Sequence, residues 1–142
     1  DCLLSRGLGD VYKRQTLLSD LIHKGVVPVM APLTHDGHGN MLNTNADTIA
    51  GETAKALSAL FDVTLVYCFE KKGVLRDEND DDSVIPQITR AEFEQYVADG
   101  VIQGGMIPKL ENSFEAINAG VSEVVITLAS AINNSGGTRI KK

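Results

Sequence analysis

The chain is poor in the residues that mark several common classes of protein. It has no tryptophan, and only 5% of its 142 residues are aromatic. Its two cysteines, Cys2 and Cys68, are too few for a disulfide framework and do not have the spacing of a metal site. No apolar run is long enough for a membrane-spanning helix, and the N-terminus lacks a signal-peptide pattern. From these absences we expect a protein of the reducing cytoplasm.

Basic residues are also scarce relative to acidic ones. The chain has 13 Lys and Arg against 19 Asp and Glu, which gives a formal net charge of −6. Non-specific binding of nucleic acid requires a basic face, so this charge argues against it. It does not argue against a nucleotide such as ATP, because a phosphate site needs only a few backbone N–H groups and one or two lysines.

Aliphatic residues, in contrast, are plentiful, and 43% of the chain is hydrophobic. This composition and length predict one α/β domain with a mainly parallel open sheet flanked by helices. Periodicity and capping signals predict helices at residues 16–24, 47–60, 90–99 and from 106 onward, strands at residues 26–32, 63–69, 121–128 and 138–140, and a hairpin over residues 34–42. Because Cys68 lies in an apolar strand, we expect it to be a buried free thiol.

Two polar stretches raise the question of a metal ion. His35 and His38 lie in a glycine-rich turn, and residues 76–82 are mostly acidic. Neither stretch has a recognised ligand spacing, such as that of an EF-hand loop. We therefore expect both stretches to be solvated.

The stretch around which the chain is organised is residues 43–47, where a turn-rich loop meets the helix of residues 47–60. Asn43, Asn45 and Asp47 would lie together at the N-terminus of this helix. Asn and Asp are ordinary helix caps there, which is the structural interpretation. The functional interpretation is an anion site, because the backbone N–H groups of a helix N-terminus point outward.

Lys109 is expected in the first turn of the helix that begins after Gly104 and Gly105. Because right-handed crossovers place successive helix N-termini at one edge of a parallel sheet, we expect the side chains of Asp47 and Lys109 to converge there. A cation at a helix N-terminus opposes the helix dipole, and this costs a few tenths of a kcal/mol. A bound phosphate would reverse the sign of that term. The structural alternative is a long side chain that simply reaches solvent.

The amino-acid sequences of these stretches resemble those of a known family. Asn-Thr-Asn-Ala-Asp-Thr-Ile-Ala at residues 43–50 is similar to the Asn-x-Asn-Ala-Asp-x-x-Ala signature of acetylglutamate kinases, a branch of the amino acid kinase family. Residues 25–33 resemble the strand before that signature. Residues 104–110 resemble the Gly-Met-x-x-Lys segment of the family, and residues 137–140 its closing strand. Order and spacing agree from about residue 16 to the end.

The resemblance implies that residues 16–142 are the C-terminal, ATP-binding part of an amino acid kinase fold, truncated at its N-terminal side. It implies transfer of the γ-phosphoryl group of ATP, with Mg²⁺, to the side-chain carboxylate of an N-acyl-L-glutamate, an early step of arginine biosynthesis. It also implies a homo-oligomer in the complete enzyme. The family's Lys-x-Gly-Gly strand, Gly-Gly substrate loop and substrate-binding Arg are not found in this sequence.

The same resemblance implies roles for particular residues. Asp47 and Lys109 would be catalytic, and Asn43 and Asn45 would bind substrate. The residues implied to contact ATP are Glu70, Lys71, Lys72, Gly73, Val74, Leu75, Val101, Ile102, Gln103 and Met106. Where the family usually has Thr-Asp-Val, this chain has Phe69, Glu70 and Lys71, so the analogy at these positions rests on backbone contacts and not on matching side chains.

Alternatives remain open at this stage. The chain could be a non-catalytic fragment that only binds nucleotide, or the substrate could be N-succinylglutamate, carbamate, glutamate or uridylate. Residues 1–15 do not fit the pattern of residues 16–142 and resemble translated sequencing-adapter sequence, so we interpret them as a non-native segment. The other possibility is a natural N-terminal segment.

Overall fold

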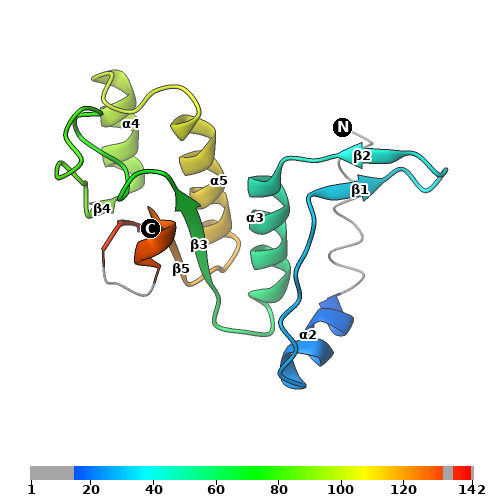
Figure 1. Ribbon diagram of the computed structural model, residues 1–142. Helices are drawn as coiled ribbons and strands as arrows, with labels where there is room; N and C mark the ends of the chain where they lie inside the picture. Colours follow the sequence, from blue (N-terminus) through cyan, green and yellow to red (C-terminus); the bar gives the residue numbers. More distant parts are fainter. Residues whose placement is uncertain (1–14, 133–135, 142) are drawn as a thin grey trace.

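The computed structural model describes residues 15–132 and 136–141, and the prediction for residues 1–15 therefore falls almost entirely outside it. Four longer helices and six strands succeed one another in an α/β arrangement (Figure 1). In chain order they are α2 (Gln15–His23), β1 (Leu33–His35), β2 (Met41–Asn43), α3 (Ala46–Leu57), β3 (Thr64–Phe69), β4 (Gln87–Ile88), α4 (Arg90–Ala98), α5 (Met106–Asn118), β5 (Glu123–Leu128), the 3₁₀ turn η1 (Ala129–Ala131) and β6 (Thr138–Ile140).

The main sheet has four strands in the order β3-β5-β6-β4. β3 pairs in parallel with β5, β6 runs antiparallel to β5, and β4 pairs in parallel with β6. The expected α/β class with a mainly parallel sheet is confirmed, since two of these three pairings are parallel. β4 was not predicted, because two residues are too few to show a period.

The core lies between the main sheet and the helices α3, α4 and α5. Its fully buried side chains include Ile88, Leu110, Val124, Ile126 and Ile140, each of which is at most 1% exposed. Burial of one such side chain stabilises the fold by roughly 1.5–3 kcal/mol. Helix α5 supplies an apolar stripe to this core. Packing of this stripe against the sheet fixes the position of α5 along the strands.

Local signals account for the helix boundaries. Gly25 comes after α2 with φ +74°, and Gly100 comes after α4 with φ +72°, so both occupy the left-handed region that favours glycine. α4 begins with a capping box, in which the side chains of Thr89 and Glu92 accept hydrogen bonds from each other's backbone N–H groups. In the described part of the chain, no helix is long and apolar enough to cross a membrane.

The predicted hairpin is present as β1 and β2, joined by a five-residue loop. The Asp36 carboxylate organises that loop, since it accepts hydrogen bonds from the side chain of Asn40 and from the backbone N–H groups of His38 and Asn40. These hydrogen bonds lower the pKa of Asp36, with the Asn40 side chain as the largest cause.

The buried strand predicted for residues 26–32 is wrong. The segment is extended but belongs to neither sheet, and Val27 and Val29 are 81% and 94% exposed. A run of valines satisfies the pattern of a buried strand, but a strand also needs a neighbour for its N–H and C=O groups. Pro28 and Pro32 lack an N–H group, which weakens any such pairing.

The prediction of a buried Cys68 is also wrong, because this thiol is exposed. Burial alternates along β3, so Leu65 and Tyr67 face the helices while Cys68 faces the opposite side. β3 is also one of the two edge strands of the main sheet. An apolar sequence therefore does not ensure that both faces of a strand are covered.

Candidate functional site

The N-terminus of α3 carries the residues of the first signature. Asn45 is the N-cap, and its Oδ1 accepts a hydrogen bond of 3.2 Å from the N–H of Thr48. Asn43 ends β2 and is exposed, and Asp47 lies in the first turn. The Asn45 side chain thus has the structural role expected of a cap, while Asn43 and Asp47 are left to face other groups.

The N-terminus of α5 is built differently. Gly104 has φ +55°, and the N-cap residue Gly105 provides no side-chain hydrogen bond. Its first turn contains no acidic residue, but it does contain Lys109. The N–H groups of Met106 and Ile107 already donate to the carbonyls of Gln103 and Gly104, both at 3.3 Å, and Pro108 has no N–H group. A phosphate at this helix start would therefore depend on Lys109 more than on free N–H groups of the first turn.

Asp47 and Lys109 converge although they are 62 positions apart in the sequence. Lys109 Nζ donates to Asp47 Oδ2 at 2.6 Å. The Lys109 side chain is 13% exposed and that of Asp47 is 36% exposed. Figure 1 shows why they meet: α3 and α5 both begin at the end toward which β3 points. Asp47 thereby offsets the unfavourable position of a lysine at a helix N-terminus.

Tyr67 is the residue at this place that sequence reasoning missed. Its hydroxyl donates to the backbone carbonyl of Asp47 at 3.2 Å, and its ring centroid lies 4.8 Å from Lys109 Nζ. Burial, with a smaller contribution from the Asp47 carboxylate, raises the pKa of Tyr67 to about 12. The only sequence signal was a hydroxyl within an apolar strand, which is typical of ordinary strands as well.

The loop after β3 divides into an exposed part and a fixed part. In the exposed part, Lys71 Nζ lies 3.1 Å from Asp81, and Lys72 Nζ lies 2.6 Å from Asp82. The hydrogen bond between Lys72 and Asp82 raises the pKa of Lys72 and lowers that of Asp82. Glu70, which precedes them in the sequence, is exposed. Both lysines therefore already have carboxylate partners, from the acidic stretch that was expected to be solvated.

The fixed part of this loop is residues 73–75. The N–H of Val74 donates to Thr138 Oγ1, and the carbonyl of Val74 accepts from the N–H of Ile85, both at 2.8 Å. A Cβ on Gly73 would lie 2.8 Å from the same threonine oxygen. Leu75 continues the segment with a bridge to Val84. The backbone of Val74 is thus occupied by the fold, and its side chain belongs to the core.

The remaining residues implied to contact ATP precede or begin α5. The Ile102 side chain is buried in the core, whereas Gln103 is exposed, and its amide donates to the carbonyl of Gly100. Val101 and Met106 are partly buried and pack against the core. Only Gln103 among these four offers a polar side chain at the surface.

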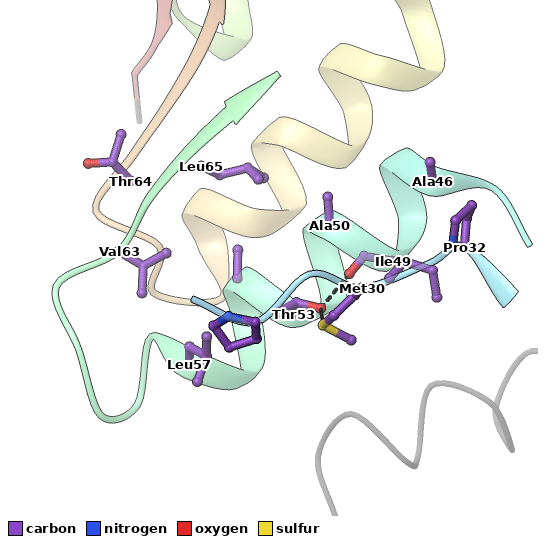
Figure 2. Close-up of a pocket in the computed structure, with 12 residues that line it drawn as sticks. Met30, Pro32, Ala46, Ile49, Ala50, Thr53, Leu57, Val63, Thr64 and Leu65 are labelled. Atoms are coloured by element: carbon purple, nitrogen blue, oxygen red, sulfur yellow. Dashed lines mark hydrogen bonds between the residues drawn. The ribbon is translucent and has the colours of Figure 1, made fainter. Parts of the chain in front are cut away.

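An apolar groove of about 340 Å³ lies along α3, where the extended segment of residues 26–32 runs beside that helix (Figure 2). Its lining comes from three parts of the chain: the extended segment with Met30 and Pro32, α3 with Ile49 and Thr53, and β3 with Leu65. Among the residues that the structure describes, no charged side chain lines it. A groove of this composition does not suit a phosphate, so it is not part of the charged site.

The histidine turn contributes no metal centre that the structure describes. Among residues 15–132 and 136–141, no group of three or more His, Cys, Asp or Glu side chains is placed to hold a metal ion. Asp47 is therefore the carboxylate of the candidate site, with Lys109 as its partner.

Comparison with known proteins gives this geometry a context. A family model described as the amino acid kinase family matches residues 8–128, which includes part of the segment interpreted as non-native. The chain is 90% identical over 136 residues to an acetylglutamate kinase of Bacteroides thetaiotaomicron, and 65% identical over 134 residues to one of Parabacteroides distasonis. These alignments include 95% and 94% of this chain, but only 53% and 52% of the length of the two relatives.

Solved structures agree on the fold. The protein smu.665 of Streptococcus mutans superposes with a TM-score of 0.71 at 32% identity, over 89% of this chain and 47% of that one. A carbamate kinase of Giardia superposes with a TM-score of 0.67 at 20% identity, over 91% of this chain and 47% of that one. The chain spans about half the length of the curated relatives that it matches, and it belongs to the amino acid kinase family.

Proposed function

We propose that the chain forms the ATP-binding half of an acetylglutamate kinase, which transfers the γ-phosphoryl group of ATP to the side-chain carboxylate of N-acetyl-L-glutamate. The observation that carries this proposal is the contact of 2.6 Å between Lys109 and Asp47, made at the first turns of two helices. High identity to relatives named acetylglutamate kinase supports the choice of substrate.

Phosphoryl transfer is mainly a matter of position and charge. An oxygen of the substrate carboxylate forms a bond to the γ-phosphorus, the bond to the bridging oxygen of ADP breaks, and ADP leaves with the electron pair. Lys109 would neutralise negative charge on the transferring group. Asp47 would orient the lysine through the contact described above.

Mg²⁺ fits this arrangement as a companion of the nucleotide. Proteins usually hold Mg²⁺ through one or two carboxylates together with substrate phosphates, rather than in a cage of side chains. Asp47 would supply such a carboxylate, and its partial exposure leaves it accessible. When bound, the ion would supply positive charge to the phosphate oxygens.

The other implied residues would contact the two substrates. Asn43, exposed at the end of β2, would bind the acylated amino acid, and Asn45 would hold the helix start beside it. ATP would lie along two segments, residues 70–75 and residues 101–106. Because Val74 and Ile102 are buried, the polar contacts would come from Glu70, Lys71, Lys72 and Gln103, while the other residues shape the surface.

A second candidate is a nucleotide-binding chain without catalysis, and the half-length match to the relatives favours it. A third keeps the enzyme but replaces the acetyl group with a succinyl group. We also propose that the complete enzyme is a homo-oligomer of the cytoplasm, by analogy with the family.

A hybrid enzyme would separate these candidates. In it, this chain replaces the matched half of the Bacteroides thetaiotaomicron relative, to which it is 90% identical. ADP formation is measured with ATP, Mg²⁺ and either acetylglutamate or succinylglutamate, and a hybrid carrying Asp47→Asn together with Lys109→Ala is the control. Acetylglutamate-dependent ADP that disappears in the control supports the proposal. A folded hybrid that forms no ADP with either acceptor rejects it.

A further inference from the structure

We propose that Tyr67 is a positioning residue of the charged site: it holds the Lys109 ammonium and the first turn of α3 in one fixed arrangement. This inference rests on the proposed function for the reaction that the arrangement serves. The geometry on which it depends is independent of that function. No motif contains Tyr67, and the family resemblance assigns it no role.

Two contacts from one side chain join both helices. The Tyr67 hydroxyl donates to the carbonyl oxygen of Asp47 in α3 at 3.2 Å. The Tyr67 ring lies 4.8 Å from Nζ of Lys109 in α5, a distance within the range of a cation–π interaction. Asp47 and Lys109 in turn contact each other at 2.6 Å. The three residues therefore form a closed triangle of contacts.

A lysine needs such a support more than an arginine would. Its ammonium is a compact charge on a flexible four-carbon stem, and three donors allow many geometries. The contact with Asp47 alone would restrict movement of the ammonium in one direction. The face of the Tyr67 ring restricts a second, because the ammonium is attracted to it. Together they leave the remaining donors of Lys109 to point toward an incoming phosphate.

Tyr67 itself is rigid and stays neutral. It is 3% exposed in the parallel pairing of β3 and β5, opposite Ile126. The hydroxyl lies against α3 near Gly51, where a Cβ would be at an ordinary van der Waals distance of 3.4 Å from the Tyr67 oxygen. A tyrosine hydroxyl is protonated, and thus a donor, throughout the neutral range even at its ordinary pKa of 10, and burial raises the pKa of Tyr67 further, to about 12.

The first test uses the chain itself and does not require activity. Protons held over an aromatic ring shift upfield in NMR spectra. In the wild-type chain, we expect the ε-methylene protons of Lys109 to be shifted upfield. The shift should persist in Tyr67→Phe, which keeps the ring, and disappear in Tyr67→Leu. The matched control is Phe93→Leu. Phe93 is also a buried aromatic residue, but it lies on α4 and packs against Phe114, so its loss should leave the Lys109 shift unchanged.

The second test uses the hybrid enzyme. Tyr67→Leu should lower kcat about tenfold, with the KM for ATP changed by less than about twofold, because the position of the charge matters most in the transition state. Tyr67→Phe should recover most of that loss. Phe93→Leu, which also removes a buried ring, should lower stability without this separation of kcat from KM.

The outcomes distinguish this inference from the proposed function. A Lys109 resonance without an upfield shift in the wild-type chain overturns the inference, whether or not the hybrid is active. So does an active hybrid in which Tyr67→Leu and Phe93→Leu behave alike. An inactive hybrid whose NMR shifts match the expected pattern rejects the proposed reaction and leaves the role of Tyr67 in fixing the pair intact.

Discussion

Lys109 occupies a position that is unfavourable for a cation unless negative charge is close by. It lies in the first turn of α5, where the helix dipole repels it, and Asp47 provides the compensating charge. Removing one partner of an ion pair that is mostly shielded from solvent is strongly destabilising, because the charge of the remaining partner is left uncompensated. Such a pair is retained more readily when a ligand uses it.

The first prediction concerns this lysine in the hybrid enzyme. Lys109→Ala should lower kcat by about 100-fold, because the charge that it neutralises develops mainly in the transition state. ATP binding should weaken by less than about tenfold. Steady-state kinetics and calorimetry measure the two effects. Lys55→Ala is the control, since Lys55 lies in the last turn of α3, at the other end of that helix from Asp47, and pairs with Glu52. Equal losses in kcat and affinity would contradict the assignment.

The second prediction concerns pH. The pKa of Tyr67 is raised from 10 to about 12 in the folded chain, so the unfolded chain loses its proton first as pH rises. The contribution of the neutral Tyr67 side chain to the free energy of unfolding is complete below pH 10, and it is lost progressively as the pH rises toward 12. The loss is roughly 3 kcal/mol.

Urea unfolding of wild type and Tyr67→Phe over this pH range measures the effect. The difference in unfolding free energy between them should shrink between pH 10 and 12. A constant difference would mean that burial does not perturb this tyrosine.

The residue scale shows what a sequence can and cannot reveal about a site. Asp47 and Lys109 were predicted to meet because each belongs to a motif and both helices were expected to start at one edge of the sheet. Tyr67 was not predicted. A tyrosine in a strand is ordinary, and only the geometry shows that its ring faces an ammonium.

At the scale of the element, α4 shows how the first turn of a helix contributes to its stability. Its apolar side is short, with only Phe93 fully buried. The capping box compensates: the Thr89 N–H donates to Glu92 Oε2 at 2.8 Å, and Thr89 Oγ1 accepts from the N–H of Glu92. These hydrogen bonds lower the pKa of Glu92, with the backbone N–H of Thr89 as the largest cause.

The third prediction concerns this helix. Thr89→Ala should destabilise the chain by about 1 kcal/mol, because one N–H group at the helix start loses its acceptor. Thr89→Ser keeps the hydroxyl and should recover most of the loss. Midpoints of urea unfolding measure both variants. If serine and alanine were equally destabilising, the hydroxyl would not be the cause.

Elements were predictable where the signal was local. Capping boxes, terminal glycines and the apolar stripe of α5 depend on neighbours within one or two turns. The strand expected at residues 26–32 failed because its stability depends on a distant hydrogen-bonding partner. Cys68 failed for a related reason, since its exposure depends on what covers the far face of the sheet.

At the scale of the whole molecule, apolar exposure is uneven. In the described part of the chain, eight of the nine large exposed hydrophobic side chains lie between residues 17 and 60, and the ninth is Ile132. The main sheet, in contrast, buries its apolar side chains well on the side of α3 and α5. Exposed apolar surface of this extent is typical of a surface that contacts another protein segment.

The fourth prediction concerns the 142-residue chain alone. We expect it to form no acylglutamate-dependent ADP, because the resemblance assigns a second catalytic lysine and a substrate arginine to motifs absent from its sequence. Nucleotide binding should be weaker than about 1 μM. The hybrid enzyme, assayed under the same conditions, is the control. Turnover by the isolated chain would show that those motifs are dispensable.

The exposed thiol of Cys68 has a practical consequence for the open side of β3. A thiol-specific reagent can report, as a rate, whether anything lies against that strand. In a Cys2→Ser background, we expect Cys68 of the isolated chain to be alkylated almost as fast as a small free thiol. In the hybrid enzyme, the same cysteine should react more slowly if the added half covers this face. An unchanged rate would place the contact elsewhere, so one chemical label can locate where the two halves of the enzyme meet.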